Sequence, residues 1–209
     1  MGTVVYRQLD EIETVSTGLR LLWSIIASTA MTIGASAFAA PGPGVADGAG
    51  QHDFDFNLGT WRTHVKRLPH PLTGSSTWAE YDGTHTIRRV WGGRANLGEL
   101  EVDGPAGHIE AVSPRLYNPR THLWSVSYGN SHDGSLSRPV VGQFKNGHGE
   151  FYGEDTFKGS VILVRELYSP IDSKTRRLEI AYSGDGGRTW ETNWRMTDTF
   201  IGAAMDATK

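Results

Sequence analysis

Short segments in which apolar and polar side chains alternate follow one another from residue 59 to residue 197. Successive side chains of a strand point to opposite faces, so this alternation predicts strands with one buried face. The segments are rich in Val, Ile, Thr, Tyr, Phe and Trp, which favour strands over helices. Ten strands are predicted, at 59–68, 76–91, 95–102, 108–117, 122–128, 138–145, 149–156, 160–168, 177–183 and 189–197.

Turn dipeptides such as Asp103-Gly104, Asn146-Gly147 and Asp185-Gly186 separate many of these segments. Glycine after Asp or Asn readily adopts the positive φ that hairpin turns need. Short connections between successive strands favour an antiparallel meander, and closure of that meander removes its exposed edges. We therefore expect an all-β fold, an antiparallel meander closed into a barrel of about 8–10 strands, with a β-sandwich as the alternative. Residues 51–58 are expected to form a short helical lid or plug before the first strand.

Four motifs follow one another along the region 53–197: Phe54-Asp55-Phe56-Asn57-Leu58-Gly59-Thr60-Trp61, Gly92-Gly93-x-x-Asn96, Leu116-Tyr117-Asn118-Pro119 with Trp124-Ser125, and Asp185-Gly186-Gly187-x-Thr189-Trp190-Glu191-x-Asn193-Trp194. Together they resemble a bacterial group of uncharacterised proteins with a predicted lipocalin-like (calycin) barrel. The resemblance implies that Trp61 packs across the closed end of the barrel and that Gly59 lets the chain pass close to it. It implies little about chemistry.

The first forty residues have a different pattern. Arg20 precedes an apolar run at 21–33, which ends in the small residues Ala35-Ser36-Ala37-Phe38-Ala39-Ala40. A basic residue, a short apolar stretch and an Ala-x-Ala site are typical of a secretory signal peptide. We expect a signal peptide at 1–40, a linker at 41–50, the barrel at 51–200 and a tail at 201–209, with the protein periplasmic or secreted and without a stable membrane span after cleavage. An uncleaved N-terminal helix or anchor is the alternative.

Composition narrows the classes of function. The chain has 209 residues and a net charge of -3, so it offers no basic excess for nucleic acid. It contains no Cys, which excludes disulfides and thiolate metal sites. None of its eight His forms a known metal-ligand spacing, so no metal or other cofactor is expected. The oligomeric state stays open.

Aromatic and basic residues on the predicted strands are candidates for a ligand site. Trp190 and Trp194 share a face of the last predicted strand, and Trp61 is placed on the same core face. Arg165 is either a surface residue or, like Arg88, an inward anchor for a carboxylate or enol oxygen. The predicted ligand-binding residues are Trp61, Arg88, Trp124, Trp190 and Trp194.

Two functions are compatible with these residues, besides an envelope protein whose aromatic residues only fill the core. The first is an exported barrel that binds a small hydrophobic or aromatic molecule in its interior. The second is a cofactor-independent enzyme, such as an isomerase, cyclase, hydratase or lyase, which needs an acid/base group beside an apolar pocket. Whether the protein is an enzyme is left open. The candidate catalytic residues are Tyr128, Glu154, Arg165 and His122.

Overall fold

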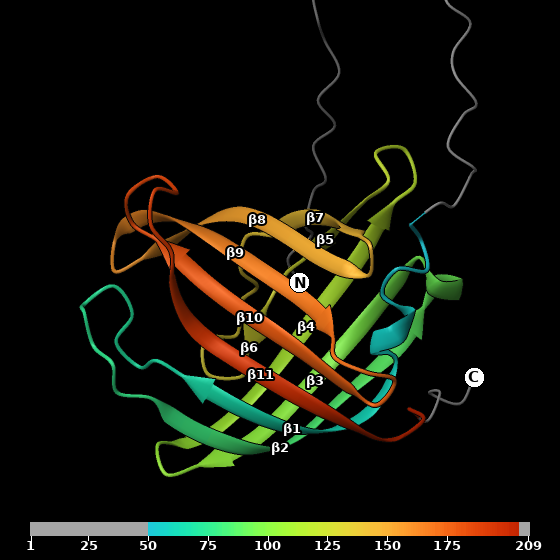
Figure 1. The fold of residues 1–209 in the computed structure, drawn as a ribbon, viewed down its shortest axis with the longest axis horizontal. Coiled ribbons are helices and arrows are strands. Elements are labelled where there is room, and N and C mark those ends of the chain that lie inside the picture. The colour runs from blue at the N-terminus through green and yellow to red at the C-terminus, as the bar shows by residue number, and fades with distance from the viewer. Residues whose placement is uncertain (1–49, 205–209) are drawn as a thin grey trace, which may run out of the picture. The chain divides into compact units, whose positions relative to one another are not determined.

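The computed structural model describes residues 50–204, and all statements about elements refer to this part of the chain. Its elements are η1 (Asp55–Asn57), β1 (Gly59–Arg67), β2 (Ala79–Val90), η2 (Trp91–Gly93), β3 (Ala95–Gly104), β4 (Gly107–Asn118), β5 (Leu123–Val126), β6 (Gly129–Asn130), β7 (Val140–Lys145), β8 (His148–Phe157), β9 (Ser160–Pro170), β10 (Thr175–Ser183) and β11 (Glu191–Gly202). Both helices are single 3-10 turns (Figure 1).

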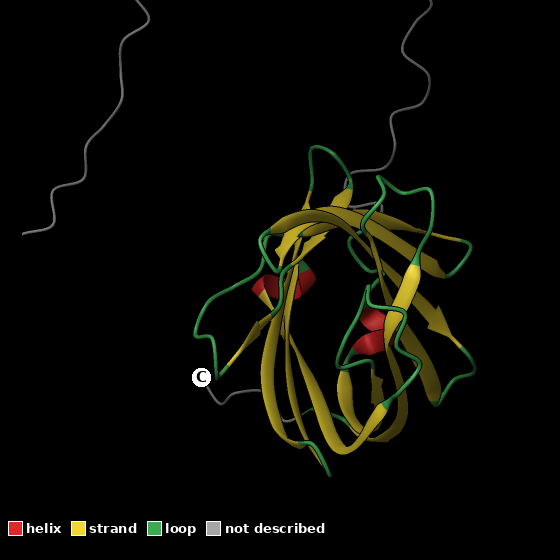
Figure 2. Ribbon diagram, turned by 90° about the vertical axis from the view of Figure 1, so that its left-hand side faces the viewer, coloured by secondary structure: helices red, strands yellow, loops and turns green. Residues whose placement is uncertain are grey.

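Ten of the strands form a closed antiparallel barrel. Neighbours along the chain pair with each other throughout, with β5 joined directly to β7, and the pairing of β1 with β11 closes the ring. The strands curve around a common axis in Figure 2. The short strand β6 pairs with β4 outside this order. The predicted all-β fold and closed meander are confirmed, and the sandwich alternative is wrong.

The hairpin between β7 and β8 shows why the turn dipeptides predict the strand boundaries well. Lys145 pairs with His148, so the connection is two residues long. These two, Asn146 and Gly147, have φ of 53° and 79°. Positive φ at both central positions matches the twist of the flanking strands, and Asn-Gly adopts it at low cost.

One end of the barrel is filled by the segment that precedes β1. Phe54, just before η1, is fully buried, and its ring lies 4.7–5.6 Å from the rings of Phe144, Trp124, Tyr168 and Phe151. Residues 51–58 therefore form the plug that the sequence predicted, although only Asp55–Asn57 are helical. Both 3-10 turns lie at this end (Figure 1), which we call the closed end.

Gly59 and Trp61 occupy the positions that the lipocalin-like resemblance implies. Gly59 has φ of +129°, and a Cβ there would lie 2.6 Å from the ring of Phe200, so no larger residue fits without a shift. Trp61 is 3% exposed and donates a hydrogen bond of 3.0 Å from Nε1 to the carbonyl oxygen of Asn57 in the plug. Trp61 thus packs at the closed end, beside the segment that fills it.

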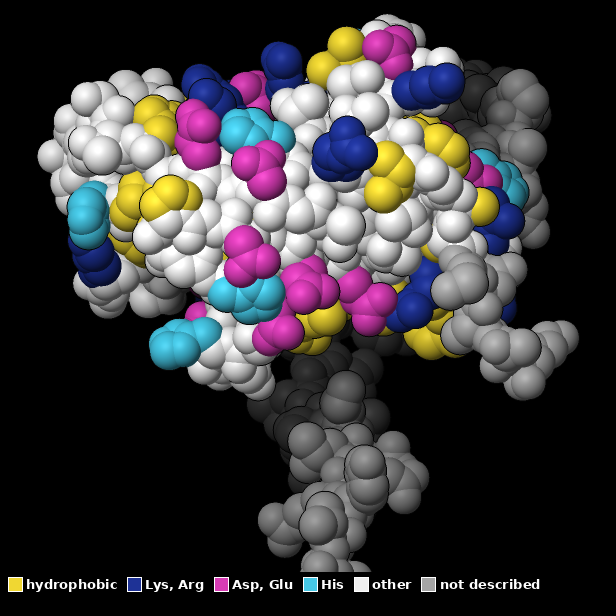
Figure 3. All heavy atoms as spheres, turned by 90° about the horizontal axis from the view of Figure 1, so that it is seen from below, with side chains coloured by type: hydrophobic (Ala, Val, Ile, Leu, Met, Phe, Trp, Pro, Cys, Tyr) yellow, Lys and Arg dark blue, Asp and Glu magenta, His cyan; other side chains and the backbone are white. Residues whose placement is uncertain are grey.

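The outer face of β1 and β2 carries charged pairs rather than a site. Figure 3 shows acidic and histidine side chains mixed on the face seen from below. Lys66 pairs with Glu80 at 2.7 Å, and His64 pairs with Asp82 at 2.8 Å, all on exposed side chains. No group of acidic and His side chains in residues 50–204 is arranged to hold a metal ion. Exposed pairs of this kind add little to stability.

Candidate functional site

The half of the barrel away from the plug contains a cavity of about 540 Å³. The inward alternation of the strands supplies its apolar wall, and the mouth lies beside the β1–β2 connection and the loop 127–138. Such a volume lies within the ~300–1,000 Å³ usual for small-molecule sites. The apolar side chains of the wall include Leu100, Ala111, Val126, Val140, Val164, Leu178, Ile180, Trp194 and Met196.

The direction in which β4 and β9 run places polar side chains deep in this cavity. Both strands start at the mouth and run toward the closed end. Along β4 the inward face reads Ala111, Ser113 and then Arg115. Along β9 it reads Val164 and then Glu166, followed by Tyr168. Toward the closed end the apolar wall is therefore followed by the polar side chains of Arg115, Glu166 and Tyr168, which we call the floor of the cavity.

Arg115 is the charged group of that floor. Its side chain is 2% exposed, and Nη1 donates a hydrogen bond of 3.1 Å to Oδ1 of Asn96 on the neighbouring strand. The guanidinium carbon lies 5.4 Å from the centre of the Phe54 ring. Its Nε is buried and has no hydrogen-bond partner in the described part of the chain. A buried charge is costly unless it is paired, so this side chain is unusual.

Glu166 and Tyr168 form a second polar group of the floor. The hydroxyl of Tyr168 donates a hydrogen bond of 2.7 Å to Oε2 of Glu166. Burial raises the pKa of Glu166, although the Tyr168 hydrogen bond and the charge of Arg115 work against the shift. Burial and the neighbouring Glu166 also raise the pKa of Tyr168, so its hydroxyl keeps its proton. A carboxyl group whose pKa is raised in a cavity is a candidate acid/base group.

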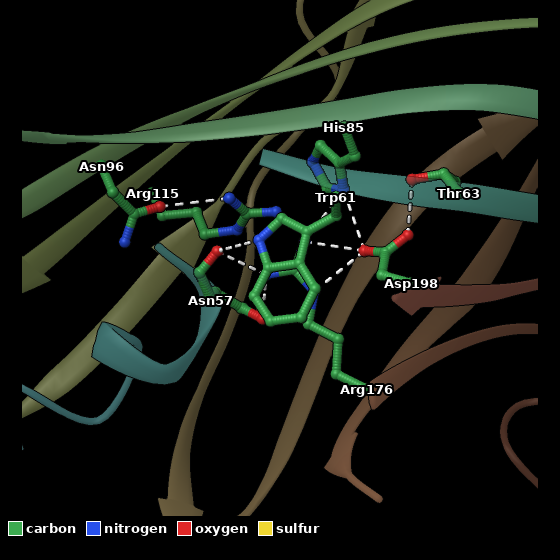
Figure 4. Close-up of polar contacts among 8 residues, drawn as sticks. All are labelled: Asn57, Trp61, Thr63, His85, Asn96, Arg115, Arg176 and Asp198. Atoms are coloured by element: carbon green, nitrogen blue, oxygen red, sulfur yellow. Dashed lines mark hydrogen bonds and ion pairs between the residues drawn. The ribbon is translucent and has the colours of Figure 1, made fainter. Parts of the chain in front are cut away.

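A network of polar side chains lies beneath the floor, at the closed end (Figure 4). Its centre is Asp198, which is 1% exposed. Asp198 accepts hydrogen bonds from Oγ1 of Thr63 at 2.6 Å and from Nε and Nη2 of Arg176 at 2.9 and 2.7 Å. Burial works to raise the pKa of Asp198, but the hydrogen bond with His85, the charge of Arg176 and the Thr63 hydroxyl lower it to about 2. Asp198 is therefore a carboxylate at neutral pH.

Arg176 joins this network to the plug. Its guanidinium carbon lies 3.9 Å from the centre of the Trp61 indole, and Nη1 donates a hydrogen bond of 2.7 Å to Oδ1 of Asn57. Burial lowers the pKa of Arg176 to about 10 against the opposing effect of Asp198, so the side chain stays charged at neutral pH. Both buried arginines lie over an aromatic ring, but of the two only Arg176 has a carboxylate counterion in the described part of the chain.

His85 connects the network to the cavity. Its Nδ1 lies 3.2 Å from Oδ2 of Asp198, whereas its other nitrogen faces Gly98. A Cβ on Gly98 would lie 2.9 Å from His85 Nε2 and 3.1 Å from Arg115 Nη1, so the absence of a side chain there leaves room between the two groups. Burial lowers the pKa of His85 to about 4, although Asp198 opposes the shift. The imidazole is therefore neutral at pH 7.

This shift predicts a pH dependence of stability. The ordinary pKa of 6.5 falls to about 4 on folding, so between these values the unfolded chain binds a proton that the folded chain does not. His85 therefore makes the free energy of unfolding fall by about 1.4 kcal/mol per pH unit as the pH drops from 6.5 to 4. Urea denaturation of the wild type and of His85→Gln across this range measures the difference. Parallel pH profiles of the two proteins would contradict the prediction.

The structure separates the candidate residues into three groups. Tyr128 and Trp194 line the cavity, and Glu154 lies at its rim on the outward face of β8. Arg165, Arg88 and Trp190 lie on the outside of the wall. Trp61, Trp124 and His122 lie at the closed end, where Trp124 donates a hydrogen bond of 2.8 Å from Nε1 to the carbonyl oxygen of Gly50 and His122 contacts the Tyr117 hydroxyl at 2.9 Å. The four candidate catalytic residues are therefore not brought together.

Both predicted anion anchors, Arg165 and Arg88, lie on the outside of the barrel. The guanidinium carbon of Arg165 stacks 4.8 Å from the centre of the Trp190 ring. Arg88 pairs with Glu99 at 2.7 Å, and both side chains line a hollow of about 740 Å³ on the outer wall. Three other positions supply the arginines that line the cavity: Arg67 and Arg138 are exposed, whereas Arg115 is buried. Arg115 was not among the residues predicted from the sequence.

A β-bulge explains why Trp190 is outside while Trp194 is inside. Ile180 pairs with Trp194 but Ala181 pairs with Thr192, so Asn193 is an extra residue in β11. An extra residue shifts the alternation of faces by one position. Asn193 and Trp194 therefore both line the cavity, and the prediction that Trp190 shares a face with Trp194 is wrong.

Comparisons with known proteins give a likeness of fold. No family model matches the chain, and no curated protein matches it either. Among solved structures, EF1p2_mFAP2b bound to DFHBI is 7% identical with a TM-score of 0.41, over 73% of this chain and 99% of that chain. The S-type phycobiliprotein lyase CPES from Guillardia theta is 11% identical with a TM-score of 0.49, over 72% of this chain and 91% of that chain. Identities and TM-scores this low indicate nothing about the function of this chain.

In residues 50–204 no helix has the length and apolar character needed to cross a membrane. The predicted signal peptide and residues 41–49 of the predicted linker lie outside the described residues.

Proposed function

We propose that the protein is an exported barrel, related to the bacterial lipocalin-like group, that binds a small hydrophobic or aromatic molecule in its interior. The observation that carries this proposal is the cavity of about 540 Å³, which is lined by many apolar side chains together with polar ones. An apolar cavity with a few polar groups is the usual form of a small-molecule site. Export rests on the pattern of residues 1–40 and the family on the four motifs.

The arrangement of the aromatic side chains supports one route for the ligand. Phe54 and its aromatic neighbours fill the closed end, so a molecule enters from the opposite side. There Tyr128, Tyr182 and Trp194 line the cavity. Flat aromatic side chains bury much apolar surface at low conformational cost, which suits an aromatic or otherwise flat ligand.

Titration with N-phenyl-1-naphthylamine tests this function. The probe is neutral and apolar, and its emission rises when it leaves water. We expect a saturable increase with one site per barrel and a dissociation constant in the micromolar range, since burial of its naphthyl and phenyl groups yields roughly 8 kcal/mol. A signal that increases linearly with probe concentration, without saturation, would contradict a defined site.

A cofactor-independent enzyme is the second candidate function. It is favoured by Glu166, because a carboxyl group with a raised pKa beside an apolar cavity can transfer protons. His85 and Tyr168 face the same space and can stabilise a developing charge. The two functions differ in the molecule that is recovered after incubation with the protein. A binding protein releases its natural ligand unchanged, whereas an enzyme releases a product. The Glu166→Gln variant is expected to lose the enzymatic conversion.

A further inference from the structure

The unpartnered polar atoms of the cavity are all donors. In residues 50–204 three buried side-chain nitrogen or oxygen atoms have no hydrogen-bond partner: Nε of Arg115, Nε of Arg165 and Nδ2 of Asn193. Arg165 lies outside the barrel, whereas Arg115 and Asn193 line the cavity. Buried donors without acceptors are rare in folded proteins and costly. What the cavity lacks is therefore an acceptor.

The charge of Arg115 indicates that this acceptor is an anion. Arg176 is paired with Asp198 at 2.7 Å, but no carboxylate in the described part of the chain lies within ion-pair distance of Arg115. Glu166, whose carboxyl group lies in the same floor, accepts its hydrogen bond from the hydroxyl of Tyr168. Burial also favours the neutral form of Glu166. In the described part of the chain Arg115 is thus a buried, positively charged side chain of the cavity without a carboxylate in ion-pair contact.

The positions of Arg115 and Asn193 along the barrel axis predict how a ligand is oriented in the cavity. Arg115 is the innermost cavity residue of β4, whereas Asn193 lies near the mouth, where its carbonyl oxygen accepts a hydrogen bond of 2.8 Å from the amide of Leu68. Between these two levels the wall is apolar, with Val164, Leu178 and Met196. A ligand with an acidic group at one end and an apolar body places its charge at the floor and its body along this wall.

We infer that Arg115 is the anchor of an anion subsite at the floor of the cavity, and that the ligand is a hydrophobic carboxylic acid bound with its carboxylate inward. This inference rests on the proposed function and specifies its ligand class. A guanidinium and a carboxylate form charge-assisted hydrogen bonds, which are strongest where water is excluded. The ligand carboxylate also gives Arg115 a counterion, and this offsets the free-energy cost of burying the guanidinium without one.

Two ligands with the same ring system test the inference on the unaltered protein. Calorimetric titration at pH 7 compares 2-naphthoate with 2-naphthalenemethanol, which differ in the charge of the group attached to the ring. We expect the carboxylate to bind at least ~10-fold more tightly, as charge-assisted hydrogen bonds do in buried sites. If the alcohol binds as tightly as the carboxylate, while N-phenyl-1-naphthylamine still binds, the anion subsite is refuted and the binding function stands. If none of the three binds, the proposed function itself fails.

Variants then assign the preference to one side chain. Arg115→Met keeps the length of the side chain and removes its charge, so the preference for 2-naphthoate is expected to disappear while N-phenyl-1-naphthylamine still binds. Arg177→Met makes the same change on the exposed outer face of β10 and should leave the preference intact. Retention of the full preference in a folded Arg115→Met protein would overturn the assignment. Should that variant not fold, the comparison of the two ligands on the wild type still decides the subsite.

Discussion

Replacement of Asp198 by asparagine is expected to lower the free energy of unfolding by about 3–5 kcal/mol. The carboxylate is the counterion of Arg176, and both side chains are buried. Asparagine has nearly the same shape, but it leaves the guanidinium charge unpaired in the interior. Because Arg176 also stacks on Trp61 and binds the plug at Asn57, the loss should loosen the closed end of the barrel.

Urea denaturation followed by circular dichroism at pH 7 measures this loss. Asp82→Asn is the matched control, because Asp82 has a histidine partner too, His64, but on the exposed outer face. We expect the control to remain within about 0.5 kcal/mol of the wild type. Equal midpoints and slopes for the two variants would show that the network does not stabilise the fold.

The barrel was predictable because its signals are local. Alternation of apolar and polar residues marks each strand, and dipeptides such as Asn146-Gly147 mark the turns. Closure followed from the number of strands and the short connections. The additional strand β6, only two residues long, was not predicted, since two residues show no alternation.

The site was less predictable, and β9 shows one reason. Both of its faces are largely apolar in sequence: Val161, Leu163 and Leu167 alternate with Ile162, Val164 and Tyr168. Yet Val161 is 68% exposed and Val164 is 8% exposed. Nothing within the segment distinguishes the face that carries Arg165 from the face that carries Glu166, so the outward arginine was selected and the inward glutamate was missed.

The second reason is that the polar floor is assembled from distant strands. His85, Arg115 and Glu166 come from β2, β4 and β9, and none forms a sequence motif with the others. The bulge at Asn193 is equally invisible in the sequence, although it changes which side chains of β11 face inward. The available sequence signal was a single polar residue among the apolar residues of one strand face. This signal is useful only if the inward face of the strand is already known.

Filling the cavity is expected to abolish binding. Val164 is 8% exposed and lines the cavity on β9, so a phenylalanine side chain at this position occupies the space of the ligand. We expect Val164→Phe to weaken the affinity for N-phenyl-1-naphthylamine at least ~100-fold, which corresponds to about 3 kcal/mol of lost apolar burial. The added ring costs at most a few kcal/mol of stability, because an empty cavity can accommodate it.

The titration of N-phenyl-1-naphthylamine into a matched pair of variants tests most directly whether the interior of the barrel is the binding site. Val161→Phe makes the same substitution on the same strand, but Val161 is 68% exposed on the outer face. If ligands occupy the interior, Val161→Phe binds the probe like the wild type and Val164→Phe, with an unchanged circular dichroism spectrum, does not bind it. Undiminished binding by folded Val164→Phe, or equal losses in both variants, would place the probe outside the barrel and contradict the account.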